Sequence, residues 1–78
     1  FVIAMRAVVL LKVRPTHEKI IEQTIRKLPY IRESMIVFGE YDIVVFIEAP
    51  DSSRVAEIVT KSIRTIDGVV KTETLLGI

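Results

Sequence analysis

The residues most able to do chemistry in this 78-residue chain form one short segment, Gly39-Glu40-Tyr41-Asp42, just before the apolar run at residues 43–47. Glycine permits an open or left-handed backbone, and successive main-chain N–H groups at such a turn can hold a carboxylate. Glu40 or Asp42 can hold an ammonium group. These are the two fixed charges of an α-amino acid, so the segment is a candidate amino-acid site. From these residues alone, a plain turn between two strands is the simpler interpretation.

A second candidate pair, Thr72 and Thr74, lies near the carboxyl end of the chain. Alternate positions of a strand share one face, so both hydroxyls could bind the polar end of a ligand. The alternative is that they are ordinary β-branched strand residues. Glu73 is expected on the opposite face, solvated or paired. His17, the only histidine, has no partner nearby in the sequence, and we expect it at the surface.

Composition argues against several classes of site and partner. No cysteine is present, which excludes disulfides and thiolate metal sites and suits a reducing cytoplasm. A single histidine argues against a metal site, and neither a nucleophile nor an oxyanion donor accompanies the carboxylates of the turn, so we predict no catalytic residue and no cofactor. The basic residues are scattered and the net charge is +1, which argues against direct nucleic-acid contact. No apolar run approaches the ~20 residues of a membrane helix.

Hydrophobic periodicity predicts the elements that position these residues. Alternating apolar residues from Ile3 to Val13 predict a first strand. A helix is expected to follow, and further strands are expected over residues 30–38 and 43–48. A second helix, capped by Asp51 or Ser52 and stopped at Asp67-Gly68, leads into a last strand over residues 69–78.

The first helix is predicted in more detail. Thr16 is expected to cap it, and Leu28-Pro29 to end it. Glu22 and Arg26 are expected to form an i,i+4 ion pair on the solvated face. The apolar positions at helical spacing are Ile20, Ile21, Ile25 and Leu28.

An internal repeat relates the two helices, because residues 19–34 match residues 57–72 at a constant offset. Apolar positions coincide, and so do Arg26 and Arg64. Two copies of strand–helix–strand with right-handed crossovers predict one domain over residues 1–78 of the α+β class. The expected fold is a ferredoxin-like βαββαβ arrangement, with an antiparallel sheet in the order 4-1-3-2 and both helices on one face.

The sheet face without helices is predicted to be apolar. Covering ~500 Å² of it would contribute on the order of 12 kcal/mol before association costs. This exceeds the net stability of a small domain, so we expect a twofold dimer, sheet against sheet, of the dimeric α+β-barrel type. The interface residues expected on this basis are Val8, Leu10, Phe38 and Phe46.

Two motifs carry a family resemblance that covers nearly the whole chain. The stretches FGEYDIVVFIEAPD and IRTIDGVVKTETLL resemble the ligand-binding domain of the Lrp/AsnC regulators, also called the RAM domain. The resemblance implies sheet-to-sheet dimers that join into rings, commonly octamers or decamers. It also implies that an amino-acid effector binds between dimers near Gly39, Glu40, Tyr41 and Asp42. Thr72 and Thr74 match the closing motif of the family.

One departure from the family pattern shapes the expected partners. The family's transcription factors carry a helix-turn-helix domain before this module, whereas here a strand begins within the first few residues. The chain therefore resembles a stand-alone sensor that would reach transcription through full-length regulators. Two alternatives remain. One is a small cofactor-free monooxygenase or isomerase with a barrel cavity lined by Arg6 and His17, against which the aliphatic face argues. The other is a structural adaptor that has lost its ligand.

Overall fold

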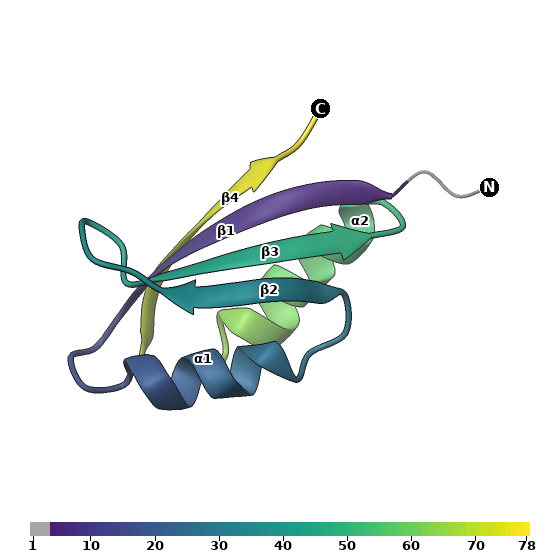
Figure 1. The fold of residues 1–78 in the computed structure, drawn as a ribbon. Helices are drawn as coiled ribbons and strands as arrows, with labels where there is room; N and C mark the ends of the chain where they lie inside the picture. Colours follow the sequence, from purple (N-terminus) through teal and green to yellow (C-terminus); the bar gives the residue numbers. More distant parts are fainter. Residues whose placement is uncertain (1–3) are drawn as a thin grey trace.

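The computed structural model in Figure 1 describes residues 4–78, so the predicted strand position Ile3 lies outside the described part. It confirms the βαββαβ order. The second helix has two sections, a regular α2 and a π-helical η1. The elements are β1 (Met5–Val13), α1 (Glu18–Arg26), β2 (Ile31–Ile36), β3 (Ile43–Ala49), α2 (Ser52–Glu57), η1 (Ile58–Ile63) and β4 (Val69–Leu76).

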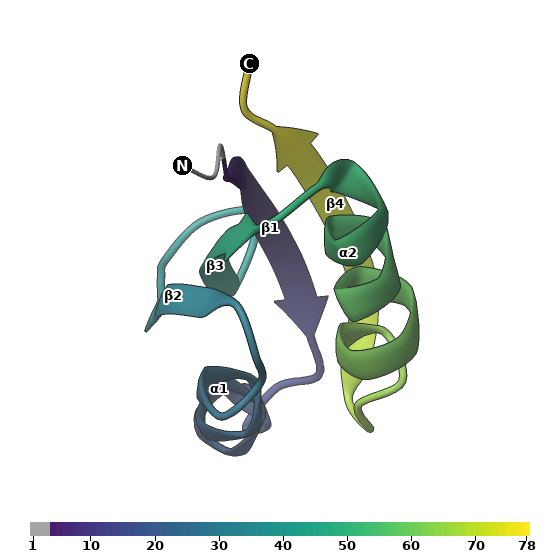
Figure 2. The same cartoon turned by 90° about the vertical axis from the view of Figure 1, so that its right-hand side faces the viewer.

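The four strands form one antiparallel sheet in the order β2-β3-β1-β4, which is the predicted order counted from the other edge. Both helices lie on the same side of it, as Figure 2 shows in a view turned by 90° from Figure 1. We call this side the helix face and the other side the open face. The predicted ferredoxin-like fold is therefore confirmed. No helix within residues 4–78 is long and apolar enough to cross a membrane.

The core lies between the helix face and the two helices. Alternate residues of the two central strands point into it because successive side chains of a strand point to opposite faces. Val9 and Leu11 of β1 and Val45 of β3 are completely buried there. The helices contribute further fully buried side chains, among them Ile21, Ile25, Val55 and Ile63.

The structure corrects three predictions about the first helix. Thr16 does not cap it: Thr16 has a φ of 72°, and His17 occupies the N-cap without a side-chain bond. The helix ends at Arg26 rather than Leu28. The N–H groups of Lys27 and Leu28, just before the proline, donate to carbonyls three residues earlier instead of four. Ile20 is 61 % exposed, since the buried stripe of this nine-residue helix passes through the next position.

The Glu22–Arg26 ion pair is confirmed, but its predicted place on a solvated face is wrong. Glu22 is only 5 % exposed, whereas the Arg26 side chain remains 66 % exposed. The carboxylate is buried because α1 packs against the edge strand β2, where the Ser34 hydroxyl donates a hydrogen bond to it.

The second helix begins as predicted and then widens. Asp51 is its N-cap and accepts a bond of 2.9 Å from the backbone N–H of Arg54. In η1 the ladder shifts to a π-helical pattern, and the Arg64 N–H donates to the carbonyl of Val59 at 2.8 Å. Periodicity in the sequence did not indicate this change.

His17 is half-buried rather than fully at the surface, because it packs against the turn after η1. Gly68 of that turn has a φ of +100°, and a Cβ there would lie 2.9 Å from Cδ2 of His17. The backbone carbonyl of Gly68 also accepts a bond from the Arg14 N–H at 2.8 Å. The glycine of the predicted helix stop is therefore needed both for its backbone angle and for close packing.

Candidate functional site

The turn at residues 39–42 is held against the end of β1 through its last residue. The Asp42 N–H donates to the carbonyl of Leu11 at 2.8 Å, and Oδ2 of Asp42 accepts the Val13 N–H at 2.9 Å. The carbonyl of Asp42 accepts the Val37 N–H across the turn at 2.9 Å. Asp42 is thus committed, at one carboxylate oxygen and both main-chain groups, to fixing where the turn lies.

The outer half of the turn is open to solvent. Gly39 has a φ of +134°, and a Cβ there would meet nothing within 4 Å. Glu40 is exposed, and its carbonyl accepts a bond of 2.9 Å from Nζ of Lys12. The turn therefore exposes a glycine backbone and a carboxylate to solvent, while hydrogen bonds of Asp42 hold its other end in place.

Tyr41 joins the turn to the far strand β4. Its hydroxyl donates a hydrogen bond of 2.5 Å to Oε1 of Glu73. This bond, with smaller contributions from burial and from the charges of Glu73 and Glu40, raises the pKa of Tyr41 above its ordinary value. The sequence placed Glu73 as solvated or paired, and it is paired. The sequence did not predict that Glu73 contacts the turn, because nothing local in the sequence links residues 41 and 73.

Thr72 and Thr74 lie on the other face of β4 from Glu73. They pair across strands with Leu11 and Val9, which are fully buried in the core, so both threonines belong to the helix face as alternate residues must. Glu73 pairs with Leu10 on the open face. The two threonines therefore share one face of β4, as predicted. The residue of β4 that contacts Tyr41 is Glu73, on the opposite face.

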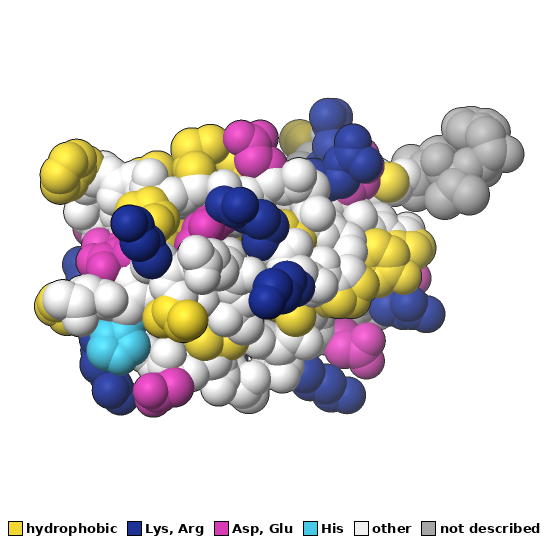
Figure 3. All heavy atoms as spheres, turned by 60° about the horizontal axis from the view of Figure 1, so that its bottom comes forward, with side chains coloured by type: hydrophobic (Ala, Val, Ile, Leu, Met, Phe, Trp, Pro, Cys, Tyr) yellow, Lys and Arg dark blue, Asp and Glu magenta, His cyan; other side chains and the backbone are white. Residues whose placement is uncertain are grey.

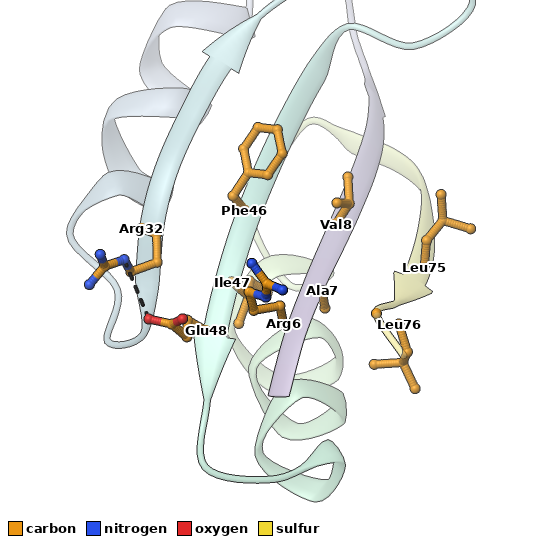
Figure 4. Close-up of a pocket in the computed structure, with 10 residues that line it drawn as sticks. Arg6, Ala7, Val8, Arg32, Phe46, Ile47, Glu48, Leu75 and Leu76 are labelled. Carbon is orange, nitrogen blue, oxygen red and sulfur yellow. Dashed lines mark ion pairs between the residues drawn. The ribbon is translucent and has the colours of Figure 1, made fainter. Parts of the chain in front are cut away.

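The open face carries apolar side chains in register across three strands. Phe46 of β3 pairs with Val8 of β1, and Val8 pairs with Leu75 of β4, which is 49 % exposed (Figure 4). Leu10 lies in the next row, opposite Val44. A groove of about 550 Å³ crosses this surface beside the first row.

Charged side chains border the same groove. Arg6 lines it, and so does an ion pair of 3.6 Å between Arg32 and Glu48, marked in Figure 4. His17 lies instead at the start of α1 and is not among the residues that line this groove with Arg6.

Phe38 stands apart from the other predicted interface residues. Because β2 ends at Ile36, Phe38 falls in the loop before the turn and is completely exposed. It lines a separate groove with Lys19 of α1 and Asp42.

The charges of the helix face are mixed. Figure 3 shows basic side chains spread among acidic ones rather than gathered into a stripe. In the described part of the chain, no three His, Cys, Asp or Glu side chains come together as a metal site requires. Side-chain hydrogen bonds in this part of the chain instead join small groups of donors and acceptors, such as the Tyr41–Glu73 pair.

Comparison with known proteins adds a family match. The model of the family described as the Lrp/AsnC ligand binding domain matches residues 6–77. A helix-turn-helix-type transcriptional regulator of Pyrococcus furiosus is 37 % identical over 62 residues, which are 80 % of this chain and 41 % of the regulator. The chain therefore spans about two fifths of the length of this curated relative.

Solved structures resemble the fold closely. The chain TTHA0845 of Thermus thermophilus superposes with a TM-score of 0.91 at 32 % identity, over 95 % of this chain and 92 % of that one. AsnC of E. coli gives 0.86 at 18 % identity, over 94 % of this chain and 50 % of that one. The regulator NMB0573 of Neisseria meningitidis, in complex with L-Met, gives 0.82 at 16 %, over 95 % and 49 %. The last two likenesses concern the fold alone.

Proposed function

The chain belongs to the Lrp/AsnC ligand-binding domain family, and from this premise we propose that it is a non-enzymatic module that binds an amino-acid effector and assembles with copies of itself. It acts in the cytoplasm, and its dimers join into a ring. It influences transcription or amino-acid metabolism through full-length regulators of the same family.

The observation that carries the assembly is the in-register apolar row of the open face. Phe46, Val8 and Leu75 lie side by side with no helix above them. Apolar surface of this kind is stabilised when a second copy removes it from water, and the twofold axis of a dimer places the same row on both sides of the contact. Leu10 extends this interface toward the Tyr41–Glu73 pair.

The turn supports the ligand part of the proposal. Gly39, Glu40, Tyr41 and Asp42 match the family motif, and Glu40 offers an exposed side chain with a carboxylate beside an exposed glycine backbone. A carboxylate can pair with the ammonium group of an amino acid. The pocket beside the turn is complete only when a neighbouring dimer covers it. Effector binding and ring assembly therefore favour each other. The proposal also includes Thr72 and Thr74, whose hydroxyls would reach the effector from the helix face of β4.

Native mass spectrometry with and without single amino acids tests both parts together. L-methionine is a suitable first probe, because the Neisseria regulator was crystallised with it. We expect dimers or larger rings, and a bound mass that changes the distribution of assemblies. A monomer at micromolar concentration would refute the assembly. Assemblies that respond to none of the twenty amino acids would refute the sensing role and leave a structural adaptor.

Two matched variants separate the open face from general surface hydrophobicity. Leu10→Glu places a charge in the middle of the open face and should give folded monomers. Ile20→Glu places the same charge on an exposed side chain of α1 and should leave the assembly unchanged. Equal effects of the two variants would contradict the proposed interface.

The partner part of the proposal has its own test. A tagged form of this chain should recover a full-length Lrp/AsnC regulator from its native cells, and Leu10→Glu should abolish that recovery. Recovery of only the chain itself would contradict a route through partner regulators.

A further inference from the structure

The first half of the internal repeat contains a buried carboxylate site. The carboxylate of Glu22 accepts bonds from Nε of Arg26 at 3.0 Å and from Nη2 at 2.6 and 2.8 Å. The hydroxyl of Ser34, on the neighbouring strand β2, donates to the same group. One guanidinium from a helix and one hydroxyl from an edge strand thus hold one carboxylate between them.

The second half repeats the donors but lacks the carboxylate. The constant offset of the repeat places Thr60, Arg64 and Thr72 at the positions of Glu22, Arg26 and Ser34. The hydroxyl of Thr60 donates to the carbonyl of Ala56 in its own helix at 2.8 Å. The ion pairs found within residues 4–78 do not include Arg64.

The tertiary structure keeps the two strand hydroxyls equivalent. Ser34 pairs with Val45 and Thr72 pairs with Leu11, and both partners are fully buried beneath the helices. The two edge strands therefore present Ser34 and Thr72 to the same face of the sheet.

An open pocket lies beside the two repeated donors, Arg64 and Thr72. Arg64 and Thr72 line it together with residues 69–71, and its volume is about 380 Å³. It lies where η1 ends and β4 begins, two segments that run alongside each other in Figure 2. The π-helical winding ends at this point, with the Arg64 N–H bonded to Val59, and such widened turns occur frequently at functional sites.

We propose that this pocket binds the carboxylate of a small ligand, which takes the place that Glu22 fills in the first half of the repeat. The guanidinium of Arg64 forms a bidentate pair with the carboxylate, and the hydroxyl of Thr72 donates a third hydrogen bond. Because Thr72 is also part of the proposed effector site, the inference deepens the proposed function and rests on it for the nature of the ligand, an amino acid.

Side-chain and amide NMR of the intact protein tests the carboxylate chemistry without knowledge of the effector. Acetate added at constant ionic strength against chloride should move the Nε–H signal of Arg64 and the amide of Thr72 in a saturable way. Glu22→Ala is the positive control, because it frees the same donors and should let acetate move the signal of Arg26. If acetate leaves Arg64 unmoved while it moves Arg26 in the control, the proposal is overturned. Equal effects of phosphate and acetate would overturn its carboxylate specificity.

A substitution that supplies the carboxylate from within the chain gives the complementary test. Thr60→Glu restores the pattern of the first half and should abolish the acetate shifts, whereas Thr60→Gln, of matched size, should retain them. Acetate shifts that persist in Thr60→Glu would overturn the assigned position.

Calorimetry with the amino acid that the protein binds separates this inference from the proposed function. Arg64→Ala should lower the affinity for that amino acid by about tenfold or more, the factor expected for loss of a charge-assisted hydrogen bond. Unchanged affinity in this variant would overturn the inference and leave the proposed function standing. Saturable acetate shifts at Arg64 in a protein that binds no amino acid would support the pocket and refute the proposed function.

Discussion

Removal of the buried carboxylate of Glu22 is the sharpest test of how the first helix is attached to the sheet. We expect Glu22→Ala to destabilise the fold, because Glu22 is 5 % exposed and accepts hydrogen bonds from Arg26 and Ser34. Glu22→Gln keeps the shape and one acceptor, and it should cost less.

The magnitude follows from which partners remain satisfied in the variant. Arg26 is 66 % exposed, so water replaces its lost partner and its charge carries little penalty. The hydroxyl of Ser34 is half-buried, and loss of its bond to a charged acceptor costs about 1.5–3 kcal/mol. Loss of the packed side chain adds to this. We therefore expect at least about 2 kcal/mol for Glu22→Ala at neutral pH, and about half of that for Glu22→Gln.

The pH dependence of this effect has a defined sign. The hydrogen bond from Ser34, assisted by Arg26 and opposed by burial, lowers the pKa of Glu22 below its ordinary value of 4.5. A carboxylate with a lowered pKa in the folded state contributes its stability above the unfolded pKa, and this contribution is lost as pH falls through the folded pKa. The difference between wild type and Glu22→Gln should therefore shrink in acid.

Urea unfolding at a fixed protein concentration, followed by circular dichroism from pH 7 to pH 2, measures both quantities. The concentration is fixed because assembly contributes to apparent stability. A Glu22→Ala variant as stable as wild type at pH 7 would refute the buried bond network. A difference from Glu22→Gln that grows as pH falls would refute the lowered pKa.

Three further substitutions probe the turn and the two ends of the second helix. In a Tyr30→Phe background, Glu73→Gln should let Tyr41 ionise at lower pH in an ultraviolet titration, since the hydrogen bond to Glu73 raises the pKa of Tyr41. An unchanged titration midpoint would contradict that hydrogen bond. Asp51→Ala should cost about 1 kcal/mol in urea unfolding through loss of the N-cap, and a neutral effect would argue against the cap. Gly68→Ala should cost at least about 1–3 kcal/mol, because positive φ and contact with His17 act together, and a change below this range would show that the turn relaxes.

Local pattern predicted most of the fold, and the misses have local causes. The alternation of β1, the Asp51 cap and the repeat were sufficient for the order and topology of the elements. The start of α1 was misplaced because Thr16 is a good capping residue by type, yet its backbone adopts a φ of 72°. The face of Ile20 was misplaced because apolar periodicity does not say which of two neighbouring isoleucines a short helix buries.

The candidate site was predicted only in part, because its contacts join residues distant in sequence. The turn residues were identified from their types and order. Their connection to Glu73 depends on the pairing of β1 with β4, which includes a register shift beside Lys12. A shift of one residue moves every side chain of a strand to the other face, so the faces of Thr72 and Glu73 relative to the turn follow from that register.

The elements, their duplication and the apolar character of both sheet faces could be predicted, because they depend on periodicity and on residue type at short range. Three features emerge only in the folded chain: the burial of Glu22, the contact of Tyr41 with Glu73, and the open pocket that Arg64 and Thr72 line. Each of these depends on how closely a helix packs on an edge strand or on the register of two strands. Such distances are set by the side chains of the whole core together, and no local stretch of the sequence encodes them.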